Sequence, residues 1–406
     1  MTFEMLETQT QGTVIKVVGV GGAGGNAVSH MIRKGVQGVE FICANTDAQS
    51  LDRSKAHQIL QLGSTGLGAG AKPEAGKAAA EQDRGRIAEL LSGAHMVFIT
   101  AGMGGGTGTG AAPVVAEVAK ELGALTVAVV TKPFSFEGPK RMQAAEQGLA
   151  ELQGKVDSLI VILNEKLEEV LGDDITQLEA FSAADDVLNN AVAGIAEIIN
   201  VEGLVNVDFE DVKTVMGEQG KAMMGTAAAS GPDRARIAAE QAVRSPLLEG
   251  VDLSGARGIL VNITANASLK LKETKLAMET IRTFAAEDAT IIFGTVHDDS
   301  MKEDMRVTVV ATGLGRSVRR PTLVPPISVP VLKTGTYDGL SGPAQPVSTE
   351  TASASAAAPS TDYAGYDQPA IWRQPPRSEA AARVLALEEG GMDRLDIPAF
   401  LRKQAD

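Results

Sequence analysis

The 406-residue sequence contains few cysteine, histidine and aromatic side chains, and each scarcity excludes a class of protein. Cys43 is the only cysteine, so an internal disulfide framework is excluded and a reducing cytoplasm is the expected compartment. The four histidines are scattered along the chain rather than spaced as metal ligands. Aromatic residues make up 3% of the chain, so the core must consist mainly of Val, Ile, Leu and Ala.

Positive charge is also scarce, because 37 Lys and Arg face 51 Asp and Glu, which gives a formal net charge of −14. General nucleic-acid binding needs a basic face, so we expect no nucleic-acid partner. No stretch approaches eighteen uninterrupted apolar residues, and residues 1–12 lack the apolar segment of a signal peptide. The sequence therefore predicts a soluble, unsecreted protein without direct membrane insertion.

Short apolar runs alternate with helical patterns over residues 13–173, after a polar tail at 1–12 that we expect to be disordered. The predicted strands and helices are listed together: strands 13–20, 39–44, 96–101, 125–130 and 158–163, and helices 26–34 and 111–122. Strands that alternate with helices favour a Rossmann-like α/β domain with a parallel sheet covered on both faces.

A long helix is predicted for residues 174–202, because apolar residues recur at three- and four-residue steps over 175–200. At 1.5 Å per residue this helix spans roughly 39 Å. Apolar residues lie on more than one of its faces, which favours a helix packed between two domains. The following segment, 203–316, predicts a second, smaller α/β domain with strands 257–265, 289–296 and 306–312 around a helix near 269–285.

Composition changes after this second domain, since residues 317–380 hold ten of the 17 prolines. Such a segment has too little apolar surface to offset its ordering entropy, so we expect a disordered linker. The last segment, 381–406, carries apolar side chains near its end, which make a merely frayed tail a poor interpretation. The apolar residues are Leu395, Ile397, Phe400 and Leu401, and they are accompanied by Pro398 and by the cations Arg402 and Lys403.

A glycine-rich turn follows the first predicted strand, where Gly19, Gly21 and Gly24 match the dinucleotide pattern G-x-G-x-x-G. Asp47 ends the next strand, as in a Rossmann site, so an NAD-dependent oxidoreductase is one alternative. A tight strand-to-helix turn without any ligand is another. This motif by itself does not decide between them.

A second glycine cluster, Gly102–Gly110, also stands between an apolar run and a helix, and a dehydrogenase does not need it. Its glycines indicate that backbone must approach something closely. Glycine-lined N–H groups, the hydroxyls of Thr107 and Thr109 and a helix N-terminus would form an anion cradle. Two such cradles in one sheet predict a polyphosphate ligand. The Walker A pattern is missing, so this is not a P-loop protein.

The sequence GGGTGTG at 104–110 resembles the signature loop of the tubulin and FtsZ superfamily, and the match is close to the bacterial FtsZ family. The resemblance extends to GVGGAGGNAV at 19–28, NTDAQ at 45–49, TKPFSFEG at 131–138, NVDFEDV at 206–212 and LDIPAFLRK at 395–403. It implies a tubulin-like fold, GTP as substrate with GDP as product, and GTPase activity coupled to self-assembly. A filament that binds GTP without hydrolysing it remains an alternative.

The resemblance also implies which residues contact the nucleotide. Phosphate contacts are expected from Gly21, Gly22, Ala23, Gly24, Gly25, Asn26, Ala69, Gly70, Ala71, Gly104, Gly105, Gly106, Thr107, Gly108, Thr109 and Gly110. Glu137 resembles the ribose contact and Arg141 a further nucleotide contact, although an i,i+4 surface ion pair would also explain these two residues. Phe181, Asp185 and Asn26 match positions that meet guanine.

Catalysis is assigned by resemblance to Asp208 and Asp211, assisted by Asn206, which would position and polarise the attacking water. From the residues alone, Asp208 also fits a helix N-cap followed by acids in the first turn. The long helix would carry this loop far from the nucleotide of its own chain, so the family resemblance implies that it completes the site of the next subunit in a head-to-tail filament. Mg²⁺ would rest mainly on phosphates and water, without a protein cage.

The family further implies a homopolymer at the division ring, in the cytoplasm at midcell under the inner membrane. Its C-terminal peptide would bind membrane-tethering and regulatory division proteins, with Arg402 and Lys403 attracting acidic partners.

Overall fold

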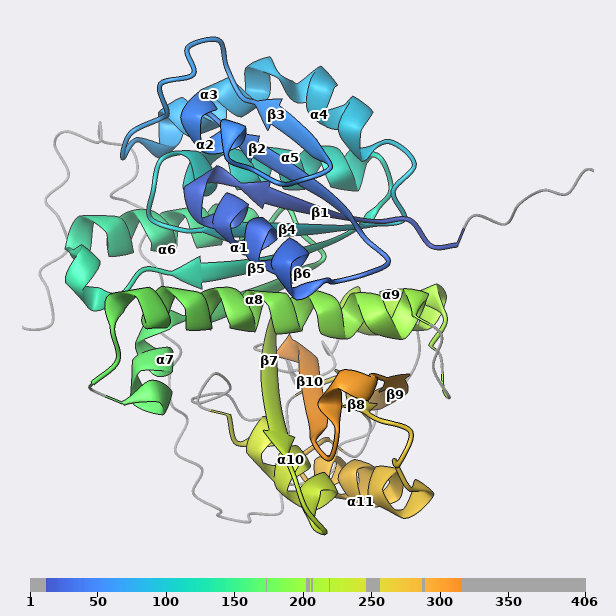
Figure 1. Ribbon diagram of the computed structural model, residues 1–406. Helices are drawn as coiled ribbons and strands as arrows, with labels where there is room; N and C mark the ends of the chain where they lie inside the picture. Colours follow the sequence, from blue (N-terminus) through green and yellow to red (C-terminus); the bar gives the residue numbers. More distant parts are fainter. Residues whose placement is uncertain are drawn as a thin grey trace, which may run out of the picture. The chain divides into compact units, whose positions relative to one another are not determined.

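The computed structural model describes residues 12–172, 174–201, 205, 207–218, 220–245, 256–286 and 289–314 (Figure 1). All of them belong to one compact unit, Met1–Leu323. Residues 1–11 of the predicted N-terminal tail, the whole of the predicted linker and the C-terminal peptide lie outside the described residues, and so does Asn206.

The strands of the described residues form one ten-stranded sheet in the order β3-β2-β1-β4-β5-β6-β7-β10-β8-β9. Their bounds are β1 Ile15–Val20, β2 Glu40–Asn45, β3 Gln58–Gln61, β4 Met96–Gly102, β5 Leu125–Lys132, β6 Ser158–Leu163, β7 Gly220–Ala229, β8 Gly258–Ala265, β9 Thr290–His297 and β10 Met305–Leu314. From β3 to β7 all neighbours are parallel, whereas β10 runs antiparallel to both β7 and β8.

The helices connect these strands and cover the sheet. Their bounds are α1 Gly21–Lys34, α2 Ala48–Asp52, α3 Pro73–Gln82, α4 Arg84–Leu91, α5 Thr107–Glu121, α6 Pro139–Gln153, α7 Asn164–Leu171, α8 Gln177–Asn200, α9 Phe209–Met216, α10 Arg234–Val243 and α11 Leu271–Arg282, with short 3₁₀ turns η1 Ser135–Glu137 and η4 Asp299–Met301.

The five strands predicted for the N-terminal half are confirmed, and β6 matches its predicted bounds. Both predicted helices begin earlier than expected, α1 at Gly21 and α5 at Thr107, because packing against the sheet overrides the low helix propensity of glycine. Strand β7 was not predicted from the sequence, since its Ala- and Gly-rich sequence GKAMMGTAAA has low β-propensity.

Alternate residues of the central strands face opposite sides of the sheet. In β1, Ile15 and Val17 join the cluster that contains α1 and α8, whereas Val18 and Val20 join the cluster under α3, α4, α5 and α6. This two-residue period is the strand signature, and both faces are covered, as a parallel sheet requires.

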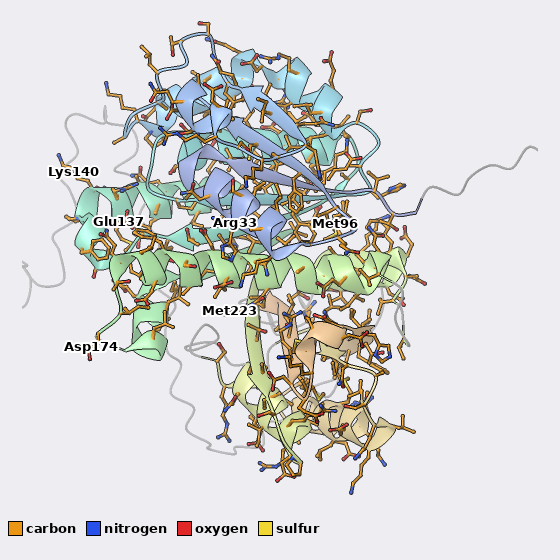
Figure 2. All side chains as sticks on the ribbon, in the orientation of Figure 1. Arg33, Met96, Glu137, Lys140, Asp174 and Met223 are labelled. Carbon is orange, nitrogen blue, oxygen red and sulfur yellow. The ribbon has the colours of Figure 1, made fainter. Side chains whose placement is uncertain are left out.

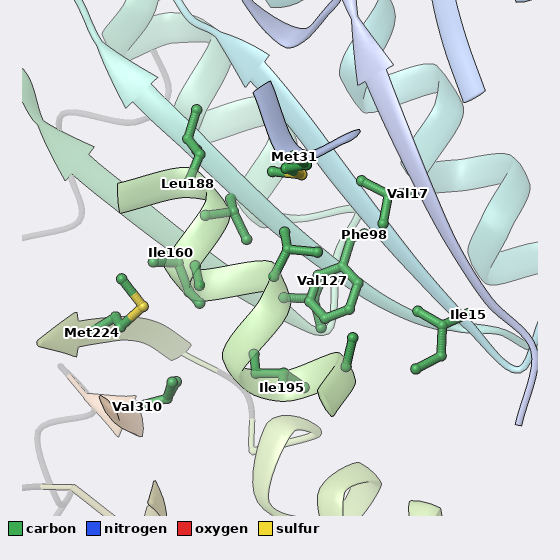
Figure 3. Close-up of a cluster of buried hydrophobic side chains, with 14 of the residues drawn as sticks. Ile15, Val17, Met31, Phe98, Val127, Ile160, Leu188, Ile195, Met224 and Val310 are labelled. Atoms are coloured by element: carbon green, nitrogen blue, oxygen red, sulfur yellow. The ribbon is translucent and has the colours of Figure 1, made fainter. Parts of the chain in front are cut away.

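Helix α8 is buried between the two halves of the sheet. Figure 3 shows Val17 and Phe98 on one side of this helix and Met224 and Val310 on the other, all in one core cluster. A capping box begins the helix, because Thr176 Oγ1 accepts the N–H of Glu179 while the Glu179 carboxylate accepts the N–H of Thr176. Its 24 residues span about 36 Å, close to the predicted length.

The second half of the sheet continues from the first rather than forming a separate sheet. Strand β7 pairs with β6 at three positions, Ser158 with Gly220, Leu159 with Lys221 and Ile160 with Ala222. A third core cluster then packs α10 and α11 against β8 and β10.

A largely buried ion pair joins α10 and α11 in this second half of the sheet. Arg234 of α10 donates from Nε and Nη2 to the Glu273 carboxylate of α11 at 2.8 and 3.2 Å, and from Nη1 to the Glu303 carbonyl at 2.8 Å. We predict that Arg234→Met destabilises the protein by about 3 kcal/mol, because the largely buried carboxylate of Glu273 loses its cation and keeps only the Lys270 N–H as a partner. Arg236→Met, on the same helix but in an exposed pair, should cost about 0.5 kcal/mol or less. Urea unfolding of both variants measures the difference, and equal losses would contradict it.

Candidate functional site

A cavity of about 530 Å³ lies where β1, β2, β4 and β5 end at the carboxyl edge of the sheet. This is the edge where ligands bind in open α/β sheets. The cavity brings together residues that are far apart in the sequence, from the first turn of α1, the loop after β4, η1 and the first half of α8. Among them are thirteen of the predicted nucleotide contacts: Gly22, Ala23, Asn26, Ala69, Gly70, Gly105, Gly106, Thr107, Gly108, Glu137, Arg141, Phe181 and Asp185.

Two helix N-termini meet at this cavity. Helix α1 follows β1 directly and α5 follows the loop after β4; neither has a side-chain N-cap or an acidic residue in its first turn. The first N–H groups of a helix have no intrahelical acceptor, and the helix dipole favours negative charge there. Two long helices that lack caps at one cavity form a site for an anion with several phosphates.

The glycines of the loop after β4 mostly allow backbone segments of the protein itself to touch. A Cβ at Gly106 would overlap the carbonyl oxygen of Gly70, and one at Gly110 would overlap that of Pro73. At Gly22, by contrast, a Cβ would meet nothing within 4 Å. The close backbone approach that these glycines predicted is therefore largely an approach of one protein loop to another, and not of the loop to a ligand.

The two threonines of the signature loop have different surroundings. Thr107 lines the cavity, and its Oγ1 lies 2.6 Å from Thr46 Oγ1. Thr109 is 2% exposed, and its Oγ1 accepts the N–H of Gly104 at 2.8 Å. The Thr109 hydroxyl thus stabilises the loop through a buried hydrogen bond and does not line the cavity. A phosphate contact had been expected for it.

At the other end of the cavity an aromatic cluster fixes the side chain of Phe181. The buried ring of Phe134 meets Phe181 edge-on at 5.3 Å between centroids and stacks on Phe136 at 5.2 Å. Edge-to-face and offset-stacked rings restrict each other's rotation. Phe181 therefore presents a largely fixed apolar surface, suited to a flat ring, to the cavity.

Glu137 and Arg141 form the ion pair that their spacing allows, with Arg141 Nη1 2.7 Å from Glu137 Oε2. The other carboxylate oxygen of Glu137 accepts the N–H of Phe134 at 3.0 Å. Both side chains also line the cavity, so the pair is part of its wall and not only a surface salt bridge.

Asp185 lines the same end of the cavity, and no hydrogen bond or ion pair joins its carboxylate to another described residue. Burial raises its pKa to about 6, an effect that nearby His30 and Arg33 reduce and the neighbouring Asp186 increases. An acceptor with two free oxygens at this position fits a base edge that donates hydrogen bonds.

The acidic turn lies at the start of α9. Asp208 is its N-cap, and its Oδ1 accepts the N–H of Asp211 at 2.9 Å, so the capping interpretation is confirmed. The carboxylate of Asp211 is exposed and has no partner among the described residues. The cap holds the turn while leaving this carboxylate open to solvent.

The acidic turn lies at the amino edge of the sheet, opposite the cavity. Phe209, next to Asp208, meets the ring of His95 at 6.1 Å, and His95 directly precedes β4. Seven-residue β4 spans about 23 Å before the glycine loop begins. Asn200 at the end of α8 donates to the carbonyls of Thr13 and Gly38, which also precede parallel strands. Figure 2 labels Met96, the first residue of β4, and Glu137 of the cavity on opposite sides of the view.

Family models match both halves of the chain: the GTPase domain of the Tubulin/FtsZ family matches residues 14–172, and the C-terminal domain of the FtsZ family matches residues 220–315. The chain belongs to the FtsZ family. This assignment carries guanine-nucleotide binding by a tubulin-like GTPase domain and a role in cell division, and it removes the dehydrogenase alternative.

Curated FtsZ relatives align over the whole chain. The cell division proteins FtsZ of Pseudomonas putida and Pseudomonas aeruginosa are each 54% identical over 407 residues, covering 100% of both chains. A solved FtsZ dimer from M. jannaschii is 44% identical, has a TM-score of 0.72, and covers 76% of this chain and 89% of its own. CetZ2 from Haloferax volcanii, at 21% identity and a TM-score of 0.65, shares the fold.

Some predicted FtsZ contacts lie outside the main cavity. Gly21 and Gly25 line an adjoining cavity of about 210 Å³. Gly24, Ala71, Gly104, Thr109 and Gly110 line neither cavity. The nucleotide contacts predicted from the family resemblance do not include the other lining residues, which are Asn45, Asp47, Ser50, Gly68, Gly102, Met103, Thr131, Pro133, Asn164, Ala184 and Leu188. Asn45 and Asp47 belong to the recognised NTDAQ motif, which could have identified them.

Two further searches concern only the described residues. None of their helices is long and apolar enough to cross a membrane. In the same part of the chain, no three His, Cys, Asp or Glu side chains are grouped so that they could hold a metal ion.

The contact between Gly106 and Gly70 leads to a paired prediction. Gly106→Ala should destabilise the protein by about 1 to 3 kcal/mol, because the new methyl group overlaps the Gly70 carbonyl. Gly22→Ala, in the open first turn of α1, should leave the free energy of unfolding unchanged or slightly raised. Denaturant unfolding without nucleotide checks both, and a stable Gly106→Ala would show that the loops need not touch.

Proposed function

We propose that this FtsZ-family chain binds GTP in the cavity at the carboxyl edge, assembles head to tail into filaments, and hydrolyses GTP at the contacts between subunits. The filaments would form the cytokinetic ring in the cytoplasm, at the midcell division site under the inner membrane. The observation that carries this proposal is the separation of the two predicted halves of the active site, with the phosphate cradle at one edge of the sheet and the acidic turn at the other.

In this proposal the N-termini of α1 and α5 bind the phosphates, together with Thr107 and the 69–71 loop. Phe181 contacts the guanine face, while Asp185 and Asn26 contact its polar edge. Glu137 binds the ribose, and Arg141 adds a positive charge beside the nucleotide. The cavity has a size typical of small-molecule sites, and its polar groups are few and fixed by neighbours, which supports this assignment.

Hydrolysis is proposed to need the acidic turn of a second copy. Within one chain the turn lies beyond the far end of β4, about 23 Å from the glycine loop, so Asp211 cannot reach the phosphates in its own cavity. The exposed carboxylate of Asp211, with Asp208 and Asn206, would position and polarise the attacking water when the turn of one subunit covers the cavity of the next. Phosphoryl transfer requires mainly such positioning and charge stabilisation.

Exposed apolar side chains around the cavity support a protein contact there. Leu67 is 89% exposed beside the cavity residue Gly68, Phe136 is 63% exposed beside Glu137, and Leu178 is 81% exposed on the first turn of α8. Gathered around one site, such side chains mark an interaction surface. A contact between two different edges is heterologous and repeats without closing, which produces a filament. The 44%-identical relative from M. jannaschii was solved as a dimer.

Mg²⁺ is proposed to accompany the nucleotide, where it would neutralise phosphate charge. The described residues offer it no cluster of three acidic, histidine or cysteine side chains, so it would rest mainly on phosphate oxygens and water. The C-terminal peptide, 395–403, is proposed to bind membrane-tethering and regulatory division proteins through its apolar side chains and its two cations.

Asp211→Ala tests the hydrolytic proposal. The variant should bind GTP with unchanged affinity but lose turnover by about 100-fold or more, because the group that positions the water is gone. Only the Asp211 N–H takes part in the cap, so the turn should remain folded. Glu210→Ala in the same turn is the matched control and should keep its turnover. Nucleotide binding, sedimentation and phosphate release are measured together, and normal turnover in Asp211→Ala would remove this residue from the mechanism.

The raised pKa of Asp185 predicts that nucleotide affinity depends on pH. Its pKa of about 6 means that the carboxylate accepts hydrogen bonds above pH 6 and becomes protonated below it. GTP affinity should therefore be full at pH 7.5 and fall by about tenfold per pH unit below pH 6. Since the nucleotide phosphate titrates in the same range, Asp185→Asn is the control and should lack the carboxyl contribution. Identical pH profiles for the two proteins would contradict the assignment of Asp185 to the base.

A further inference from the structure

A hydrogen-bond chain centred on the buried side chain of His30 joins α1 to α8 beside the end of the cavity where the base is proposed to bind. His30 is 6% exposed, and its Nε2 lies 2.9 Å from Asp186 Oδ1, which also lies 3.1 Å from Lys34 Nζ. Arg33 Nη2 lies 3.3 Å from His30 Nδ1. A guanidinium only donates, so Nδ1 is the acceptor and the Nε2 proton is donated to Asp186. His30 thus uses both ring nitrogens.

The residue held by His30 is the direct neighbour of Asp185. Successive residues of an α-helix point about 100° apart, so fixing the direction of Asp186 also fixes that of Asp185. Asp186 is bound toward α1, whereas Asp185 lines the nucleotide cavity and an adjoining groove that it shares with His30, Arg33 and Phe181. Although burial opposes it, the bonds from His30 and Lys34 hold the pKa of Asp186 below its usual value. Asp186 is therefore ionised at neutral pH.

Helix α1 both lines the phosphate end of the cavity with its first turn and carries His30. Gly22 lies in the first turn of α1 at the phosphate end, and His30 lies eight residues further, about 12 Å along the axis. Figure 2 shows Arg33, in the last turn of α1, close to α8. A rigid α1 therefore sets the spacing between the phosphate cradle and the helix that carries Asp185.

We propose that His30 is a positioning residue for base selectivity: through Asp186 it holds the turn of α8 that presents Asp185 to guanine. The inference rests on the proposed contact between Asp185 and the base. In guanine the N1–H and the 2-amino group both donate, so a correctly oriented carboxylate selects for the base that carries both. His30 does not touch the nucleotide in this arrangement and acts through Asp186.

The test compares the dissociation constants of GTP and ITP, which lacks the 2-amino group, for the full-length chain. Asp185→Ala should reduce the preference for GTP. His30→Ala should reduce it by about fivefold, the loss of one net hydrogen bond, and His30→Gln should restore it because a glutamine N–H can replace Nε2–H. Asp186→Ala should give the same loss as His30→Ala. In the Asp185→Ala background, His30→Ala should change the preference no further.

The controls separate this inference from the proposed function. Ser29→Ala, on the same helix, removes only a bond to the Gly25 carbonyl and should keep the preference. If Asp185→Ala lowers the preference while His30→Ala and Asp186→Ala lower only thermal stability, His30 is merely structural and the inference is overturned, although the base contact stands. If Asp185→Ala leaves the preference unchanged, the base contact itself is wrong and both fail.

Discussion

The burial of α8 between the two halves of the sheet is the constraint on which the rest of the structure depends. Its side chains belong to a core cluster that contains residues from β1, β4 and β5 on one side and from β7, β8 and β10 on the other. A helix packed on both sides cannot shift without exposing apolar surface to water. It therefore holds the cavity beside its first half and the acidic turn beyond its end, at a separation that one chain cannot close.

The proposed phosphate cradle is held together by contacts within the protein itself. Two helix N-termini without caps meet there, and tight contacts between the glycine loops fix their relative position. Phe134 orients Phe181 in a similar way at the base end, and His30 holds the neighbour of Asp185. Such preorganisation lowers the entropy lost on binding. The acidic turn is also fixed by its Asp208 cap, so the proposed assembly would bring two ordered surfaces together.

Much of this arrangement could be predicted from the sequence. Apolar runs located β1, β2, β4, β5 and β6, because buried strands rich in Val and Ile have a strong pattern, but the short polar strand β3 was not predicted. The two glycine clusters marked the cavity. Strand β7 could not be found, since its alanines and glycines pack well only where β6 and β10 already flank it. The buried bond of Thr109 and the His30–Asp186 contact depend on tertiary geometry, which joins residues 156 positions apart in the latter case.

The central claim is that GTP hydrolysis requires two subunits. Phosphate release from GTP per protein molecule, measured over a range of protein concentrations with sedimentation of the same samples, tests it most directly. The account predicts specific activity near zero at low concentration that rises in proportion to sedimented polymer. Constant specific activity at all concentrations would mean that each monomer holds a complete active site, and it would contradict the assignment of Asp208 and Asp211 to the neighbouring subunit's nucleotide.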